Sequence, residues 1–126
     1  PGMRAPVIRL TSLCSSACAP TANTLYANTM VKAWAAGVDG SSGCCGSILG
    51  SFNVGRITRT GTGAYVVSLL TPLNSTGYVV VGNVRSSAQR VAVAYDQTIS
   101  SFGFNTYNQG GAALDTEWDF MLVGPQ

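Results

Sequence analysis

Short runs of residues, some alternating between hydrophobic and polar and others mostly apolar, follow one another after residue 53, and turn-forming residues separate them. Such runs predict β-strands, because successive side chains of a strand point to opposite faces of a sheet. We expect six strands in this part of the chain, over residues 54–60, 64–70, 78–84, 90–96, 99–106 and 118–123. Glycine, proline, asparagine and serine fill the connections, as they do in turns generally.

A further strand is predicted over residues 29–38, where both faces carry apolar residues. One face would hold Val31, Ala33 and Ala35, and the other Met30, Lys32 and Trp34. A strand that is apolar on both sides needs a cover on both sides, so we expect a partner to pack over it, such as a second copy of the chain. No segment shows sustained helical periodicity, although Thr21 or Asn23 could cap a short helical turn ahead of this strand.

These elements predict an all-β domain, an antiparallel β-sandwich or barrel-like fold with a short N-terminal helical turn. Residues 1–22 hold three prolines and predict an extended lead-in, with at most a short strand over 7–13, and residues 23–126 form the domain. A chain of 126 residues has room for one hydrophobic core. Because it opens with Pro-Gly, we expect it to be part of a longer protein.

Charged residues make up only 10% of the chain, against roughly 25% in typical soluble domains. A domain so poor in charge leaves neutral or apolar surface exposed, which favours burial between subunits. Seven basic and five acidic residues are scattered without runs, unlike the clustered basic residues of a nucleic-acid-binding surface.

No apolar stretch reaches the length of about 18 residues that a membrane span needs, so we expect no membrane insertion.

Little in the sequence indicates catalysis. The chain has no histidine, the commonest general base and a frequent metal ligand. Asp115, Glu117 and Asp119 would share one face of an extended segment, and a glycosidase needs two carboxylates beside the scissile bond. We interpret them as a solvated loop that leads into an edge strand, and calcium binding is a weaker option because the usual calcium-loop spacing is missing. The glycine-rich stretches lack the motif of a phosphate loop, so we expect neither an enzyme nor a cofactor.

The four cysteines, Cys14, Cys18, Cys44 and Cys45, leave three interpretations open. They could ligate zinc or an iron cluster, although their spacing departs from the paired CxxC motifs of such sites. One disulfide could join the lead-in to the glycine-rich loop, within or between chains. All four could also be free thiols. The sequence does not decide whether they bind a metal.

An aromatic residue among amides is the best candidate for a binding surface. Tyr107 lies in a predicted loop beside Asn105, Asn108 and Gln109, and such a group suits a carbohydrate. Most other aromatic residues that could stack on a sugar fall inside predicted strands, where packing in the core is the default explanation.

Six short motifs follow one another along the chain: NTLY at 23–26, VKAW at 31–34, SFNV at 51–54, ITRTGTGAYV at 57–66, TGYVVVGNV at 76–84 and FMLVG at 120–124. Their order resembles that in the C-terminal domain of the tail fibres of tailed bacteriophages. The likeness covers roughly residues 23–124 and rests on the combined order, since each motif alone is weak. The Cys44-Cys45 pair is not part of this pattern.

The resemblance implies a homotrimer at the distal end of a fibre in the virion, joined to the remainder of the tail fibre and binding a bacterial surface polysaccharide or lipopolysaccharide. Loops 85–89 and 106–111 would supply the contacts, with Arg85 and the Tyr107 cluster, and three weak sites would act together. The expected trimer-interface residues are Leu25, Tyr26, Met30 and Trp34. Two alternatives are a structural domain that trimerises and caps the fibre without touching the receptor, and a polysaccharide depolymerase that uses the acidic cluster.

Overall fold

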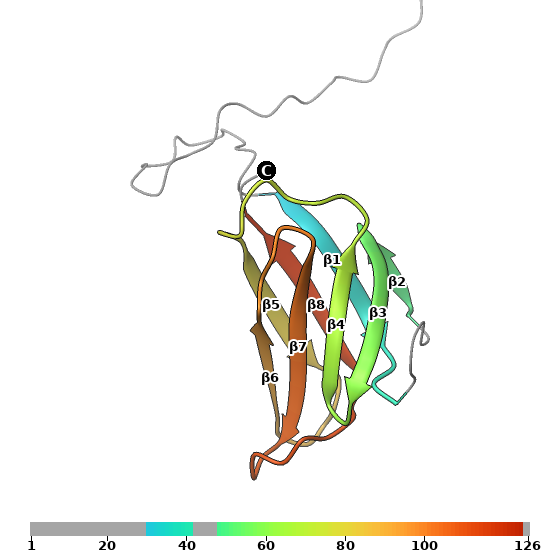
Figure 1. Ribbon diagram of the computed structural model, residues 1–126. Helices are drawn as coiled ribbons and strands as arrows, with labels where there is room; N and C mark the ends of the chain where they lie inside the picture. The colour runs from blue at the N-terminus through green and yellow to red at the C-terminus, as the bar shows by residue number, and fades with distance from the viewer. Residues whose placement is uncertain (1–29, 42–47, 125–126) are drawn as a thin grey trace, which may run out of the picture.

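The computed structural model describes residues 30–41 and 48–124 (Figure 1). Its strands are β1 (Val31–Val38), β2 (Gly50–Phe52), β3 (Val54–Gly61), β4 (Ala64–Leu69), β5 (Val79–Val84), β6 (Arg90–Tyr95), β7 (Ser101–Asn108) and β8 (Trp118–Val123). The six strands predicted after residue 53 are all present, with ends that differ from the prediction by at most two residues. The described ranges contain no helix, and hence none that could span a membrane. The predicted helical turn and lead-in lie outside them.

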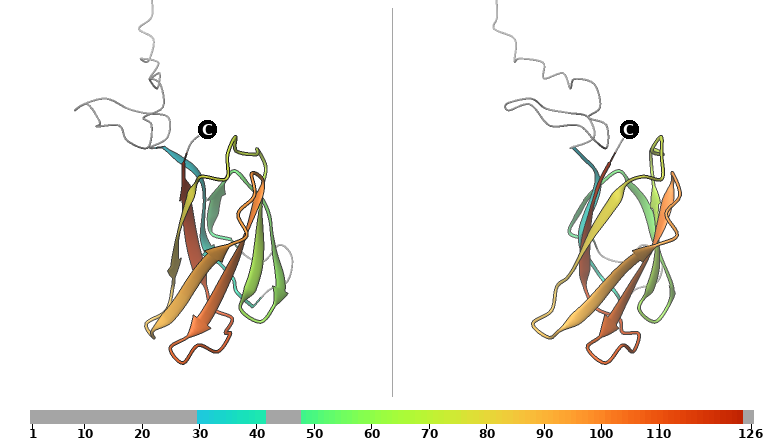
Figure 2. Two further views of the ribbon diagram at one scale, coloured as in Figure 1. Left: turned by 60° about the vertical axis from the view of Figure 1, so that its left-hand side comes forward. Right: turned by 90° about the vertical axis from the view of Figure 1, so that its left-hand side faces the viewer.

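Two antiparallel four-stranded sheets face each other (Figures 1 and 2). We name each sheet by its two central strands. The β1/β8 sheet has the order β2-β1-β8-β5, and the β4/β7 sheet has the order β3-β4-β7-β6. The prediction of an all-β antiparallel fold is therefore confirmed, and the two facing sheets make it a sandwich.

A layer of aromatic and aliphatic side chains fills the space between the sheets. Trp118 of β8 stacks on Phe104 of β7 with ring centroids 4.1 Å apart, and Phe120 of β8 meets Phe102 of β7 edge to face at 5.0 Å. Both arrangements are favoured by the charge distribution of aromatic rings. These pairs hold the central strands of the two sheets together, and all four rings are buried.

Asn53 marks the point where the chain passes from one sheet to the other. It lies between β2 and β3, which belong to different sheets, and its φ is 57°. Asparagine tolerates this left-handed conformation better than most residues, so one residue suffices to redirect the chain. Sequence reasoning missed β2, because three residues at the end of a glycine-rich stretch carry no measurable periodicity.

The faces predicted for β1 are wrong at its beginning. Ala33 and Ala35 are buried, but Val31, which was expected on the same face, is exposed, and Lys32 is buried. The pairing of β1 with β8 shifts in register between Val31 and Ala33. An irregularity of this kind moves the side chains on one side of it to the opposite face, and strict alternation cannot anticipate it.

Candidate functional site

The loops gather at the two ends of the sandwich. Met30 and the end of β8 lie at one end, and the β3–β4 turn, the β5–β6 loop and the β7–β8 loop lie at the other (Figures 1 and 2). We name the second end the distal end and define it as residues 62–63, 85–89 and 109–117. Two of the loops there are joined directly, because the Arg85 N–H donates to the Glu117 carbonyl oxygen at 2.8 Å.

The Asp115 carboxylate organises the distal end. It accepts hydrogen bonds from Arg59 Nη2 at 2.9 Å, from the Gly63 N–H at 2.8 Å and from the Tyr65 hydroxyl at 3.1 Å. One side chain therefore ties the β7–β8 loop to β3, β4 and the turn between them, through bonds that are strengthened by charge. The hydrogen bond from the Arg59 guanidinium lowers the pKa of Asp115, whereas burial raises the pKa of Tyr65 to about 12.

Three of the five residues predicted to bind a receptor lie at or beside the distal end. Arg85 begins the β5–β6 loop and forms an exposed ion pair with Glu117, with 3.4 Å between Nη1 and Oε1. Gln109 is exposed in the β7–β8 loop. Asn108 ends β7, and its side-chain oxygen accepts two backbone N–H groups of that loop, at 2.9 and 3.0 Å. Asn108 thus shapes the loop that presents Gln109.

The other two, Asn105 and Tyr107, lie in a strand, so the prediction of a loop around Tyr107 is wrong. Both belong to β7, where Tyr107 pairs with Val91 of β6. Asn105 Nδ2 donates to the Tyr107 hydroxyl at 3.0 Å, and Asn105 Oδ1 is buried with no hydrogen-bond partner among the described residues. Strand β7 continues past its apolar residues because backbone pairing with β6 holds it, whatever the polarity of the side chains.

The three clustered carboxylates have separate partners. Asp115 binds Arg59, Glu117 binds Arg85, and Asp119 accepts from the Gly37 N–H at 2.6 Å and from Asn83 Nδ2 at 3.3 Å. Within residues 30–41 and 48–124, no group of three potential ligands could hold a metal ion. All four cysteines lie outside those ranges.

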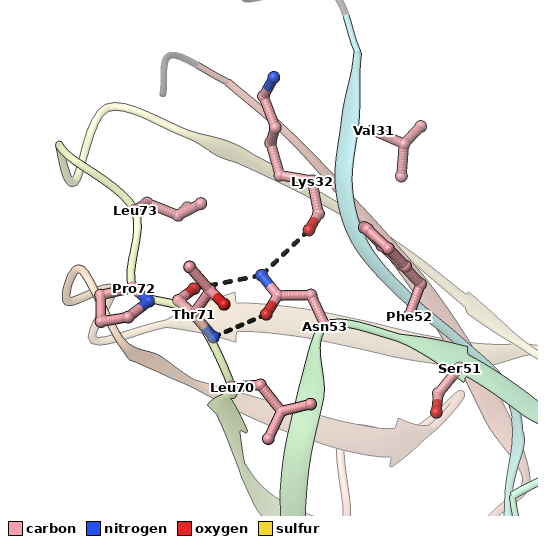
Figure 3. Close-up of a pocket in the computed structure, with 9 residues that line it drawn as sticks. All are labelled: Val31, Lys32, Ser51, Phe52, Asn53, Leu70, Thr71, Pro72 and Leu73. Atoms are coloured by element: carbon pink, nitrogen blue, oxygen red, sulfur yellow. Dashed lines mark hydrogen bonds between the residues drawn. The ribbon is translucent and has the colours of Figure 1, made fainter.

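A groove of about 590 Å³ lies near the opposite end, at the corner where the chain passes between the two sheets (Figure 3). It is lined by β1, β2 and the segment after β4, through Val31, Lys32, Ser51, Phe52, Asn53, Leu70, Thr71, Pro72 and Leu73. The Asn53 amide is used inside the protein, since Nδ2 donates to the Lys32 and Thr71 carbonyl oxygens at 3.1 and 3.2 Å. The remaining lining is mainly apolar and suits a hydrophobic side chain better than a sugar.

The outer face of the β1/β8 sheet is apolar and exposed. A row of four side chains stands in direct register across all four strands: Phe52, Trp34, Met121 and Val81. Each has between 38% and 55% of its surface exposed. A second row crosses β1, β8 and β5: Val31, Val123 and Val79. We name these seven residues the apolar face.

Sequence reasoning found only part of the apolar face. Of the predicted interface residues, Trp34 lies in its first row, Met30 is exposed just before β1, and Leu25 and Tyr26 lie outside the described residues. Phe52, Met121 and the β5 valines were not singled out. Met121 and the β5 valines occur in runs that are apolar at successive positions, and such runs do not tell which side is covered by the core. Phe52 lies in the short strand β2, which sequence reasoning missed.

Comparison with known proteins adds no relative: no family model, no curated protein and no solved structure matches this chain. A function therefore has to follow from the two features described above. They are the loop cluster at the distal end and the apolar face of the β1/β8 sheet.

Proposed function

We propose that this domain is the receptor-binding tip of a bacteriophage tail fibre, a homotrimer that binds a polysaccharide or lipopolysaccharide on a bacterial surface. One observation carries the proposal: the loops 85–89 and 109–117 lie together at the end of the sandwich opposite Met30. A fibre stalk that joined the domain ahead of Met30 would leave these loops farthest from the particle, where contact with a cell is made. The order of motifs along the chain supports the same function.

The distal end is suited to binding because its loops are held in place before any ligand arrives. Asp115 bonds to Arg59, Gly63 and Tyr65, and the backbone of Arg85 bonds to that of Glu117. Loops that are already ordered lose less conformational entropy when they bind. More of the favourable free energy of a weak contact with a sugar then contributes to the affinity.

The exposed groups at the distal end fit the chemistry of a bacterial surface glycan. The Arg85 guanidinium offers charged donors that match carboxylate or phosphate groups, and the Gln109 amide can both donate to and accept from sugar hydroxyls. A trimer would present three such sites, and simultaneous engagement would raise the overall affinity well above that of one site. No cofactor takes part in this function.

The two alternatives rest on different features. A structural cap without receptor contact would use the apolar face alone. A depolymerase would need two carboxylates beside one glycosidic bond, and the separate partners of Asp115, Glu117 and Asp119 do not favour that arrangement.

Adsorption of the fluorescently labelled chain to a panel of bacterial strains tests the proposal. We expect binding to at least one strain, competition by its purified surface polysaccharide, and at least tenfold weaker binding by the double variant Arg85→Ala and Gln109→Ala. The matched control is Asn74→Ala, an exposed loop residue at the opposite end. A trimer that adsorbs to no strain would leave only the structural cap, and shortening of the polysaccharide would establish the depolymerase.

A further inference from the structure

The apolar face is among the largest apolar patches that a solitary domain exposes. Seven apolar side chains form two adjacent rows in register on one sheet, with no polar residue between neighbours in a row. Six of them have between 38% and 61% of their surface exposed, and Val123 is half-buried. Together they expose on the order of 500 Å², near the upper limit for the largest patch on a monomer. Covering a face of this size would supply much of the roughly 800 Å² that one partner buries in a stable interface.

The apolar face carries no charge. Asp119, the acidic residue nearest to it in β8, is engaged by the Gly37 N–H and by Asn83 Nδ2. About a threefold axis, the same residues of three copies approach one another, and a face without charge allows this with no repulsion between like charges. Recognition of a different protein usually relies on placed charges or polar groups, so the occupant that fits best is another copy of this chain.

The outer face of the β4/β7 sheet is different. Its exposed apolar residues are confined to the edge strand β6, at Val91, Val93 and Tyr95, and other strands of the sheet carry polar residues such as Asn105 of β7 and Arg56 of β3. Only one of the two sheets therefore presents apolar residues across all four of its strands. We therefore expect the β1/β8 sheet to be covered by other copies of the chain and the β4/β7 sheet to face water.

We infer that three copies of this chain associate through the apolar face of the β1/β8 sheet, with Trp34 and Met121 near the centre of the contact. The surface follows from exposure and strand register, and the number three rests on the proposed function. The groove shares Val31 and Phe52 with the apolar face (Figure 3). It opens beside the interface, where a hydrophobic side chain of a neighbouring copy can enter it.

Two matched substitutions test this surface. Val81 and Val91 are valines on edge strands of opposite sheets, and each has 48% of its surface exposed. By light scattering at fixed protein concentration we expect the unmodified chain near three times its 13.0 kDa. Val81→Glu should shift the mass towards one chain, because it places charge in the contact, and Val91→Glu should leave it unchanged. A monomeric unmodified chain, or an equal effect of the two substitutions, would overturn the inference.

Tryptophan fluorescence gives a second measurement that needs no disruptive variant. The chain has two tryptophans, of which Trp118 is buried in the core and Trp34 lies on the apolar face. Acrylamide should quench Trp34 only after dilution separates the copies, and Trp34→Phe should abolish that dependence on concentration. Free quenching of Trp34 in the assembled form would refute the proposal that the apolar face is the contact between copies, but it would leave the proposal of receptor binding untouched. An assembly with Trp34 shielded that adsorbs to no cell would refute receptor binding alone.

Discussion

The side-chain amide of Asn53 makes two hydrogen bonds to the backbone of Thr71: its oxygen accepts from the N–H at 2.7 Å, and its nitrogen donates to the carbonyl oxygen at 3.2 Å. The same nitrogen donates to the Lys32 carbonyl oxygen at 3.1 Å (Figure 3). Asn53 thus satisfies backbone groups of β1 in one sheet and of the segment that follows β4 of the other, at the residue where the chain passes between the sheets. The Asn53 side chain therefore stabilises the turn between β2 and β3, although its sequence context, SFNV, looks like part of a strand.

Asn53→Ala should therefore lower the free energy of unfolding by roughly 2–3 kcal/mol, through the lost hydrogen bonds and the cost of placing alanine at positive φ. Asn53→Gly removes the bonds but accepts the backbone conformation, so we expect a loss of only about 1–2 kcal/mol. Urea unfolding at one protein concentration measures both, since association shifts apparent stability. A glycine variant as stable as the unmodified chain would show that the hydrogen bonds contribute nothing.

Asp115 should make the stability of the domain depend on acidity. Its pKa is lowered from 3.8 in the folded state by the hydrogen bond from Arg59, so the unfolded chain takes up the proton first as the pH falls. The stabilisation is complete well above pH 3.8 and is lost as the pH drops through the lowered pKa. Melting temperatures between about pH 6 and pH 2 should fall more steeply for the unmodified chain than for Asp115→Asn.

A suitable control for that comparison is Glu117→Gln. Its carboxylate forms an exposed ion pair with Arg85, and exposed pairs contribute little to stability. We expect its melting temperatures to follow those of the unmodified chain over the whole range. Parallel curves for all three proteins would contradict the role assigned to Asp115.

We expect a side chain at Gly82 to destabilise the fold. A Cβ there would lie 2.5 Å from Cε2 of Phe104, whose ring is stacked on Trp118 and cannot move freely. Gly82→Ala should cost roughly 1–3 kcal/mol through overpacking, as thermal or urea unfolding would show. Gly61→Ala is the control, because a Cβ at Gly61 would meet nothing within 4 Å. Equal stability of the two variants would mean that the Phe104 ring relaxes without cost.

Arg85→Ala should separate binding from folding. The ion pair with Glu117 spans 3.4 Å between side chains that are 40% and 45% exposed, so its loss should change stability by less than about 1 kcal/mol. Adsorption to a susceptible strain should nevertheless fall. Arg56→Ala removes an exposed arginine of β3 away from the distal end and should leave adsorption as it was. A similar fall for both variants would indicate a general effect of charge and no specific contact.

Much of the secondary structure could be predicted from the sequence alone. The runs AYVVSL and RVAVAY became β4 and β6 because their length, β-branched residues and flanking turns favour a strand in any all-β domain. The prediction failed at Tyr107, where a strand continues through polar residues, and at Gly50–Phe52, where a strand is only three residues long. In both places pairing with a neighbouring strand outweighs local preference.

The candidate site was less predictable. Arg85 and Gln109 could be placed in loops from their surroundings, but nothing local indicates that Arg59 and Asp115, 56 residues apart, hold the distal loops together.

The sequence by itself determined the all-β class, the positions of most strands and the scarcity of charge, because these depend on composition and on a repeat of two residues. Only the tertiary structure decided which side of each apolar strand is covered. Trp34 and Trp118 both lie in apolar strands, yet one is on the surface and the other is fully buried. The difference arises because burial depends on the second sheet, which packs against one face of the first and leaves the other uncovered.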